Sequence, residues 1–188
     1  MSIRKKQEKI SDIYFCTFTC HEWLQLFKIT DLYDFIFQWF DLLKQKGIKI
    51  IAYVIMPNHI HFIVSLPENS KRIDKIIGNG KRFMAYEIVK RLKDANSDEI
   101  LLKLRTGVSE KEQLKNKQHN VFIPSFDAKQ IFTKEFMVQK INYIHTNPVR
   151  GKWNLIEDYR YYQYSSAGFY ELENYSGYEV IHYSDIWE

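Results

Sequence analysis

Residues 56–64, with the sequence Met-Pro-Asn-His-Ile-His-Phe-Ile-Val, lie at the centre of the predicted fold. Residues 48–56 and 59–66 are two apolar runs, and the Pro57-Asn58 pair between them is typical of a turn. The two runs therefore predict a pair of antiparallel strands joined as a hairpin.

The second strand of this hairpin carries two histidines that flank one apolar residue. Alternate side chains of a strand point to the same face, so His59 and His61 project together while Ile60 packs into the core behind them. Two imidazoles on one rigid strand can bind a single metal ion. A turn that merely carries two histidines is the ordinary alternative, because the His-x-His pattern is common.

The chain before the hairpin predicts one strand and one helix. Residues 13–20 are rich in aromatic and β-branched residues, which favour strands. The apolar residues within 32–43 recur at helical spacing, with Thr30 or Asp31 as the N-cap and Gly47 as the stop.

The chain after the hairpin predicts a second helix and a further strand. The helix runs to residue 94 and is interrupted around the Gly-Asn-Gly of residues 78–80. Residues 95–120 are polar and charged, without a convincing buried face. Residues 121–123 regain strand character, and residues 130–132 continue the extended structure.

The third helix begins at the cap Thr133 and ends near Asn147, because Pro148 disfavours a helical conformation of the residue before it. Met137, Ile141 and Ile144 form a stripe that faces the core. Tyr143 and Asn147 form an i, i+4 line elsewhere on the helix. Packing or decoration of the surface is the ordinary explanation of such a tyrosine in a chain with thirteen of them.

The order strand, helix, strand, strand, helix, strand is the split βαβ pattern. It predicts an α+β, ferredoxin-like fold with a four- to five-stranded antiparallel sheet and helices packed on it. We expect the helices to cover one face and to leave the other for ligands. Residues 1–170 then form one domain with a polar insertion at 95–120, and residues 171–188 form a tail that is packed on the domain or flexible.

Composition is that of a folded protein with a mildly basic surface. A hydrophobic content of 45% with 16% aromatics argues against disorder. The net charge of +4 permits an anionic partner without requiring one. No run is long enough to span a membrane, and residues 1–6 lack the apolar core of a signal peptide, so we expect a cytoplasmic protein without a membrane partner.

Cys16 and Cys20 lie roughly 13 Å apart on one strand, too far for a disulfide, so we expect reduced thiols.

Together, the histidine pair and the third helix indicate a site for phosphate chemistry. Two imidazoles suit several divalent metals, and the side-chain oxygen of Asn147 offers a third ligand. Such a shell leaves positions for phosphate oxygens or water. Tyr143, one turn before Asn147, would lie beside the metal, although its hydroxyl ionises near pH 10 when free and needs help to act as a nucleophile. The sequence does not identify a base for its proton.

Two motifs in this order resemble the single-tyrosine HUH transposases. The first is His59-Ile60-His61 after Met-Pro-Asn, and the second is Tyr-Ile-His-Thr-Asn-Pro-Val-Arg-Gly at residues 143–151. Within that family, the REP-associated tyrosine transposases are most similar, because their paired-serine stretch resembles residues 158–166 here. The likeness covers roughly residues 13–170.

The resemblance implies a metal-dependent endonuclease and strand-transferase, a transposase that cuts single-stranded DNA near a folded hairpin. By matching position, His59, His61 and Asn147 would hold Mg²⁺ or Mn²⁺. Tyr143 would be the nucleophile and would form a 5′-phosphotyrosine linkage, leaving a free 3′-hydroxyl. Two features depart from the family: the long stretch 95–120, and Lys152-Trp153 where small and aliphatic residues are expected.

The expected partner is DNA, and the expected location is the bacterial cytoplasm, on the nucleoid when DNA is bound. A basic stretch and one further arginine would contact phosphates, with a solvated helix face as the equal alternative: Lys71, Arg72, Lys75, Lys81, Arg82 and Arg150. His145, next to the site, would assist proton transfer or simply cap the helix end. The sequence leaves open whether the site is completed in one chain or across a homodimer.

Two other functions remain open at this point. One is a non-catalytic nucleic-acid-binding module derived from a transposase, although binding alone needs no set of two histidines, a tyrosine and an asparagine. The other is a metal-dependent phosphodiesterase that uses activated water and forms no covalent product with DNA.

Overall fold

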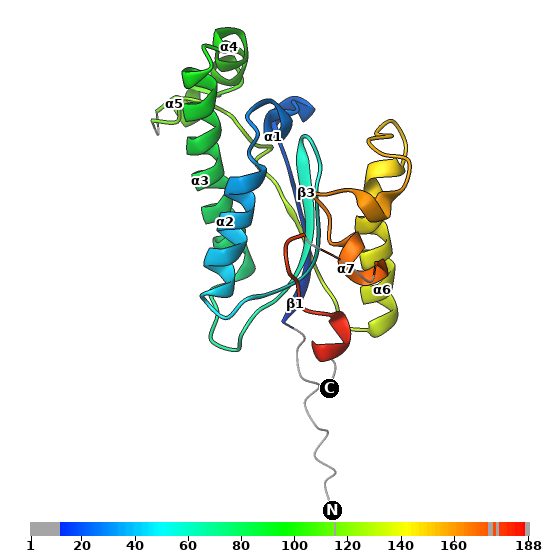
Figure 1. Ribbon diagram of the computed structural model, residues 1–188. Coiled ribbons are helices and arrows are strands. Elements are labelled where there is room, and N and C mark those ends of the chain that lie inside the picture. Colours follow the sequence, from blue (N-terminus) through cyan, green and yellow to red (C-terminus); the bar gives the residue numbers. More distant parts are fainter. Residues whose placement is uncertain (1–11, 115, 173–174, 176, 187–188) are drawn as a thin grey trace, which may run out of the picture.

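The computed structural model describes residues 12–114, 116–172, 175 and 177–186. Its centre is a four-stranded antiparallel sheet in the order β2-β3-β1-β4 (Figure 1). The strands are β1 (Ile13–Thr19), β2 (Lys49–Ile55), β3 (His59–Ser65) and β4 (Asp127–Gln130). The predicted α+β fold with an antiparallel sheet is confirmed. The fourth strand lies a few residues after the expected 121–123, where the described chain makes only an isolated bridge between Phe122 and Cys20.

Helices lie on both faces of the sheet. One face carries α2 (Tyr33–Lys44) and α3 (Ile73–Asp94), and the other carries α6 (Lys134–His145) with α7 (Ala167–Glu171) (Figure 1). The expectation that the helices share one face is wrong. Both faces of the sheet are apolar, and burying each of them removes that surface from water. The shorter elements are α1 (Leu26–Ile29), α4 (Asp98–Thr106), α5 (Glu110–Gln113), η1 (His21–Trp23), η2 (Asn147–Val149), η3 (Tyr159–Tyr161) and η4 (Tyr183–Ile186).

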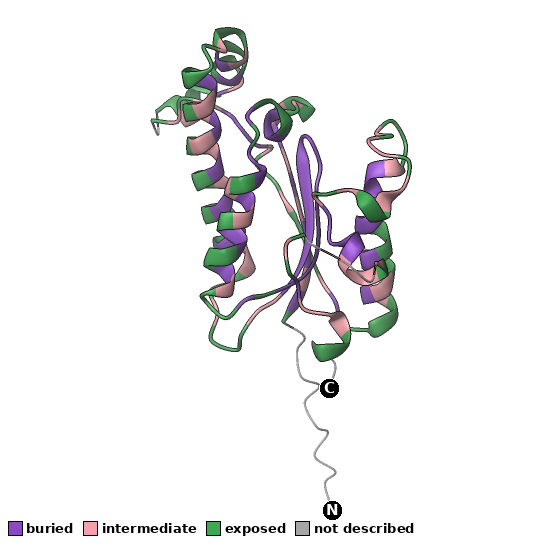
Figure 2. Cartoon of the chain, in the orientation of Figure 1, coloured by how far each residue is buried: buried purple, intermediate pink, exposed green. Residues whose placement is uncertain are grey.

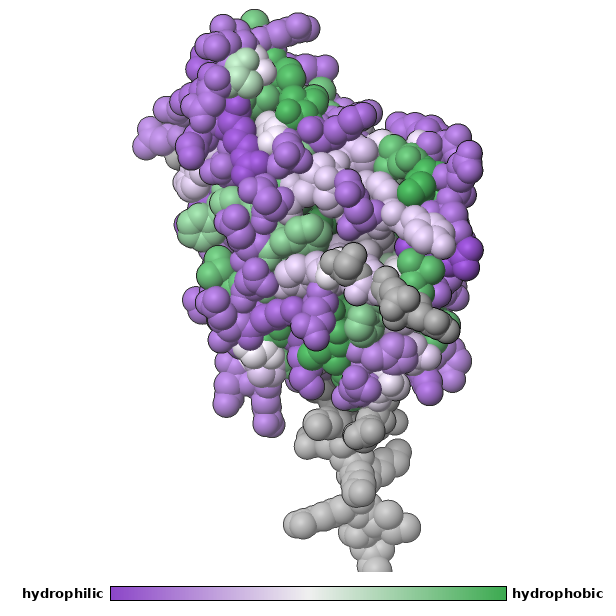
Figure 3. Space-filling view, in the orientation of Figure 1, coloured by the Kyte–Doolittle hydropathy of each residue, from purple (hydrophilic) through white to green (hydrophobic). Residues whose placement is uncertain are grey.

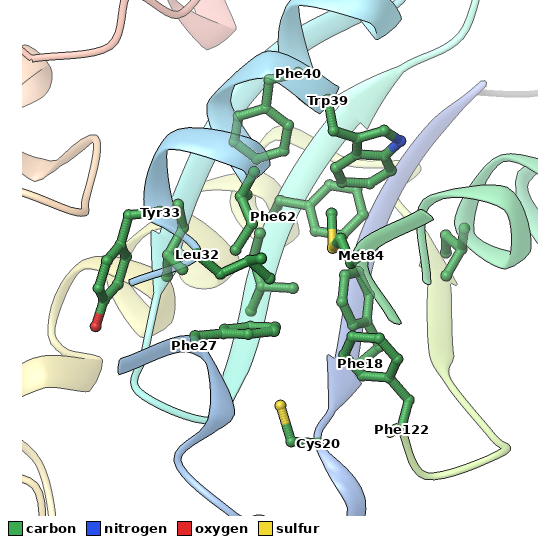
Figure 4. Close-up of a cluster of buried hydrophobic side chains, with 14 of the residues drawn as sticks. Phe18, Cys20, Phe27, Leu32, Tyr33, Trp39, Phe40, Phe62, Met84 and Phe122 are labelled. Atoms are coloured by element: carbon green, nitrogen blue, oxygen red, sulfur yellow. The ribbon is translucent and has the colours of Figure 1, made fainter. Parts of the chain in front are cut away.

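The larger core fills the space between the sheet and the pair α2 and α3, and it is strongly aromatic (Figure 4). Phe62 of β3 lies edge-on to Phe18 of β1 and to Trp39 of α2. Its side chain is fully buried, which contributes about 1.5–3 kcal/mol. Burial is most continuous along β2 and β3, and the inner faces of the helices are buried as well, whereas the edge strand β4 has exposed and half-buried residues (Figure 2).

The second core lies between the opposite face of the sheet and α6. Met137, Ile141 and Ile144 are buried in it, so the predicted apolar stripe of this helix is confirmed. Phe15 and Ile63 come from the sheet. Because α6 docks through this stripe, its neighbouring residues are held at the sheet face that carries the two histidines.

The first long helix starts later than its sequence suggests. α2 begins at Tyr33 with Leu32 at its N-cap, and no side chain caps it. The Thr30 hydroxyl donates instead to the Leu26 carbonyl at 2.7 Å, within the preceding turn of α1. Asp31 lies between the two helices with a left-handed φ of 46°. The N-cap of α2 is therefore neither Thr30 nor Asp31, the two residues that the sequence predicts.

The second helix is continuous, contrary to the predicted interruption at residues 78–80. α3 runs unbroken from Ile73 to Asp94. A Cβ atom at Gly80 would come within 2.7 Å of the Trp39 ring. This glycine therefore allows α3 to approach α2 closely, and it does not break the helix.

The described residues of the segment 95–120 fold against the rest of the domain. Leu101 and Leu104 on α4 and Val108 after it are buried. Asn120 donates from its side-chain amide to the Gly107 carbonyl at 3.1 Å. The segment therefore has a buried face, contrary to the impression that its many charges give.

The paired serines fasten the C-terminal part of the chain to β2. Ser165 and Ser166 are fully buried. The Ser166 hydroxyl accepts from the Tyr53 amide at 3.0 Å and lies 2.9 Å from Nε2 of His145. Farther on, the Ile181 amide donates to the Ile50 carbonyl at 2.9 Å.

Among the residues that the structure describes, no helix combines the length and apolar character that crossing a bilayer requires.

Candidate active site

The two histidines of β3 project together from the sheet face that α6 covers. Their ring centroids lie 4.8 Å apart. Both side chains are almost fully buried, with 5% of His59 and 6% of His61 exposed. The strand alternation that the sequence predicts therefore places two imidazoles side by side.

Asn58 sets the orientation of the His59 ring. The Asn58 amide nitrogen donates to the Trp23 carbonyl at 2.8 Å, which turns its oxygen toward Nδ1 of His59 at 2.6 Å. Nδ1 of His59 is thus the donor, so in the neutral ring the lone pair is on Nε2. A partner that holds one ring nitrogen so that the other can bind is typical of metal-ligating histidines.

Thr17 plays the corresponding part for His61. The two residues are directly opposite each other in the β1–β3 ladder. The Thr17 hydroxyl lies 2.6 Å from Nδ1 of His61. Both rings are therefore anchored through Nδ1, one by a turn residue and the other by the neighbouring strand.

Burial keeps both imidazoles neutral at pH 7. It lowers the pKa of His59 to about 4, with a further lowering by Lys152 and an opposing contribution from a hydrogen bond to Asn147. Burial lowers the pKa of His61 to about 3, and His59 and Lys140 lower it further. Neutral imidazole is the form that binds metal.

Tyr143 on α6 lies beside the histidine pair. Its ring centroid is 5.2 Å from that of His61 and 6.0 Å from that of Phe15. Its side chain remains 38% exposed, so a solvent-borne substrate can reach it. The Lys140 ammonium lies 5.7 Å from the centre of the Tyr143 ring and brings a positive charge to this edge of the site.

Asn147 completes the set. It is the first residue of η2, it is buried, and its side chain hydrogen-bonds His59. The Thr133 side chain caps the start of α6 by accepting from the Phe136 amide at 3.2 Å, as the sequence predicts. The described chain thus brings together all four residues that the sequence singles out.

The donors gathered here are two imidazole nitrogens and one amide oxygen. Among the described residues, no group of three or more His, Cys, Asp or Glu side chains is placed to hold a metal ion, and this site has two such residues together with an asparagine. Both histidines are neutral and have Nδ1 occupied, so the chemistry of this set fits a divalent metal bound through Nε2 and an amide oxygen.

Two tryptophans that the sequence did not assign to the site border His59. The ring of Trp23 lies 6.0 Å from it and that of Trp153 lies 5.8 Å from it, between centroids. Trp23 is 55% exposed and has a left-handed φ of 58°. Lys152 lies over the Trp153 ring at 5.6 Å. The only sequence signal for these contacts was the unusual Lys152-Trp153 pair.

His145 contacts the C-terminal part of the chain. Burial lowers its pKa to about 4, and its ring packs on Tyr170. With Ser166 as its hydrogen-bond partner, it connects the end of α6 to the paired serines. These contacts account for the residue without a part in proton transfer.

The predicted DNA-contacting cations occupy different settings, and their role stays a prediction. Lys71, Lys75 and Arg150 are exposed, whereas Arg72 pairs with Asp74 at 3.2 Å. The Lys81 ammonium donates to the Ile123 carbonyl at 2.7 Å and contacts two further carbonyls. Arg82 lies over the Phe83 ring at 5.0 Å.

The comparisons with known proteins agree with the sequence motifs. The model of the family described as "Transposase IS200 like" matches residues 25–104, which include both histidines. The predicted resemblance is confirmed. No curated protein matches the chain.

The solved structures that are similar to the chain include two whose descriptions name a transposase. One is described as a "REP associates tyrosine transposase bound to a REP hairpin"; it is 19% identical, covers 96% of this chain and 99% of its own, and has a TM-score of 0.53. This likeness supports the fold. The other is a putative transposase from Deinococcus radiodurans, 15% identical, covering 76% of this chain and 95% of its own with a TM-score of 0.38, too low to bear on the fold.

Proposed function

We propose that this protein is a transposase: a metal-dependent, single-stranded DNA endonuclease and strand-transferase that acts through Tyr143. The observation that carries the proposal is the convergence of Tyr143 from α6 with the histidine pair of β3, 5.2 Å from ring to ring. The match to the IS200-like family over residues 25–104 supports the same function. The relative with the REP hairpin suggests hairpin-forming DNA as the substrate here.

His59, His61 and Asn147 would hold the metal ion, Mg²⁺ or Mn²⁺. Mg²⁺ prefers oxygen ligands, so the two imidazole nitrogens favour Mn²⁺. When bound, the ion would polarise the scissile phosphate and offset the negative charge that develops on it. The protein's own contribution is to hold the two rings by Nδ1 and to keep both of them neutral.

Tyr143 would supply the attacking oxygen. Its hydroxyl gives up a proton, its oxygen bonds to phosphorus, and the bond from phosphorus to the 3′-oxygen breaks. That oxygen takes a proton and leaves as a 3′-hydroxyl, while the 5′ side stays attached to the tyrosine. Lys140, whose ammonium lies near both Tyr143 and Phe15, would attract the phosphate.

A covalent-adduct assay tests this proposal. The protein is mixed with Mn²⁺ and hairpin-bearing single-stranded DNA, denatured, and examined for a DNA-linked band. We expect the wild-type protein and Tyr161→Phe, which alters another exposed tyrosine, to form the band, and Tyr143→Phe to form none. An equal band from Tyr143→Phe would overturn the assignment, and metal-dependent cleavage without any adduct would indicate a phosphodiesterase that uses water.

We further propose that one chain forms a complete site, because all four residues converge within it. Mixing His61→Ala with Tyr143→Phe then restores no adduct, since neither chain holds both groups. Adduct formation by the mixture, with each variant inactive alone, would show instead that residues from two subunits complete the site.

A further inference from the structure

A concave site lies on the side of the sheet opposite the proposed active site. It is a cavity of about 700 Å³ between α3 and the chain segment 116–121. This volume falls within the range of about 300–1,000 Å³ that is usual for ligand sites. The residues described around it include none of the four proposed active-site residues. We call it the α3 cavity.

The α3 cavity has an apolar floor and an exposed aromatic side chain. Ala85, Val89 and Val121 supply the floor. Tyr86, one turn after Arg82 on the helix, lines the cavity with 66% of its surface exposed. A large aromatic ring left this open has room to receive a flat ligand on one face.

Positive charge surrounds this opening. Among the described residues that line it are three exposed cations of α3, namely Arg82, Lys90 and Lys93, and one acid, Asp94. Lys117 lines it as well, but its ammonium is already paired with Glu112 at 2.6 Å. The described lining of the cavity therefore has more cations than acids, and no ion pair among the described residues includes Arg82, Lys90 or Lys93.

Other cations of the same helix are used within the protein. Arg91 donates to Glu87 at 2.8 Å and to Asp34 at 3.0 Å. Lys81 donates to backbone carbonyls. The structure thus separates the basic stretch of α3 into residues that hold the fold together and residues that face the cavity.

His119, on the opposite wall of the cavity, is also affected by nearby positive charges. Burial lowers its pKa, and Arg105 and Lys93 lower it further. Figure 3 shows mainly hydrophilic residues over the part of the molecule where α3, α4 and α5 lie. An anionic ligand would relieve this repulsion among like charges.

An aromatic face beside a row of cations is the combination that binds single-stranded nucleic acid, because bases stack on the ring while phosphates pair with the cations. We propose that the α3 cavity is a second DNA-binding site that takes an unpaired nucleotide of the substrate. Tyr86 stacks on its base, and Lys90 and Lys93 contact the flanking phosphates. This inference rests on the proposed function, which makes DNA the partner.

The test measures DNA binding separately from cleavage. Affinity for a hairpin-bearing oligonucleotide with single-stranded flanks is measured by fluorescence anisotropy in the Tyr143→Phe background, over a series of salt concentrations. Adding Tyr86→Ala should weaken binding about 5- to 150-fold, the usual effect of losing one stacked base. Adding Lys90→Ala with Lys93→Ala should reduce the slope of log affinity against log salt by about 1.4, since each single-strand phosphate contributes about 0.7.

Matched controls use exposed residues elsewhere in the domain. Phe132→Ala removes another exposed aromatic ring, and Lys46→Ala with Lys49→Ala removes two exposed cations near the start of β2. Both controls should bind DNA as the parent does. Equal affinity and equal salt slope for the cavity variants and their controls would overturn the inference.

The outcome is separable from that of the proposed function. With Tyr143 intact, Tyr86→Ala should raise the DNA concentration that gives half-maximal adduct formation and leave the rate at saturation unchanged. Adduct formation combined with unaltered binding by the cavity variants would reject the cavity alone. An absence of adduct in the wild-type protein, with binding still weakened by Tyr86→Ala, would reject the nuclease and keep the DNA site.

Discussion

The hydrogen bond between Thr17 and His61 offers a direct test of how the sheet prepares the proposed metal site. Replacing Thr17 by valine removes the hydroxyl and keeps a β-branched side chain that suits a strand. The bond is 2.6 Å long, and only 6% of His61 is exposed, so water does not easily replace the lost partner. The substitution therefore leaves Nδ1 of His61 buried without its hydrogen bond.

Two effects should follow, and their sizes can be estimated. A buried polar atom without a partner costs about 1–3 kcal/mol, so the free energy of unfolding should fall by that amount. Loss of a residue that orients a metal-ligating histidine typically weakens metal affinity by about 10- to 100-fold. His61 keeps its Nε2, so binding should be weakened and not abolished.

The tryptophans beside His59 provide the assay. Mn²⁺ bound between the histidines should quench the fluorescence of Trp23 and Trp153, whose rings lie about 6 Å from His59. Titration with Mn²⁺ gives the affinity, and urea unfolding without metal gives the stability. Thr19→Val is the matched control, since Thr19 lies on the same strand opposite His59 and the described residues offer its hydroxyl no hydrogen bond. Equal Mn²⁺ affinity for the two variants would refute the reasoning.

Two further predictions concern stability. Burial lowers the pKa values of His59, His61 and His145 to between about 3 and 4, so the unfolded chain binds protons before the folded chain does as the pH falls. The free energy of unfolding should therefore be fully retained above about pH 6.5 and should decline toward pH 4, by on the order of 2 kcal/mol per histidine at about pH 5. A urea-unfolding profile that is flat over this pH range would contradict the burial of the three rings. On α3, Gly80→Ala should destabilise the protein by about 1–3 kcal/mol, because the added Cβ would meet the Trp39 ring. Gly78 has open space around it, so Gly78→Ala should stabilise the helix by about 0.5–1 kcal/mol. Thermal unfolding that finds Gly80→Ala more stable than Gly78→Ala would contradict the close approach of α2 and α3.

The sequence predicts most of the fold because its signals are local. The Pro57-Asn58 turn, the alternation across His59 and His61, and the Thr133 cap each depend on a few neighbouring residues, and the structure has all of them. The predictions that fail depend on distant partners. Gly80 looks like a helix breaker until Trp39 is placed against it, and Leu101 looks exposed until α4 packs on α3.

The site shows the same division. Residue types and spacing identify the histidine pair, Tyr143 and Asn147. They could not identify Thr17, because its contact with His61 follows from the register of β1 against β3. Nor could they identify Trp23. It lies beside His59 because Glu22 and Trp23 have left-handed φ values, a conformation that the sequence would signal only if glycine stood there.

The packing of α6 explains why the tyrosine can reach the histidines at all. The apolar stripe of α6 packs against one face of the sheet, where β2, β3 and β1 supply apolar side chains. Here the sheet face ends in two histidines, and the helix stripe is bordered by Tyr143, so the burial of Ile141 and Ile144 also fixes the distance between the rings. A substitution that loosens this core, such as Ile144→Ala, should therefore reduce adduct formation even where the protein remains folded, because the hydrophobic contact and the reactive geometry are set by the same helix.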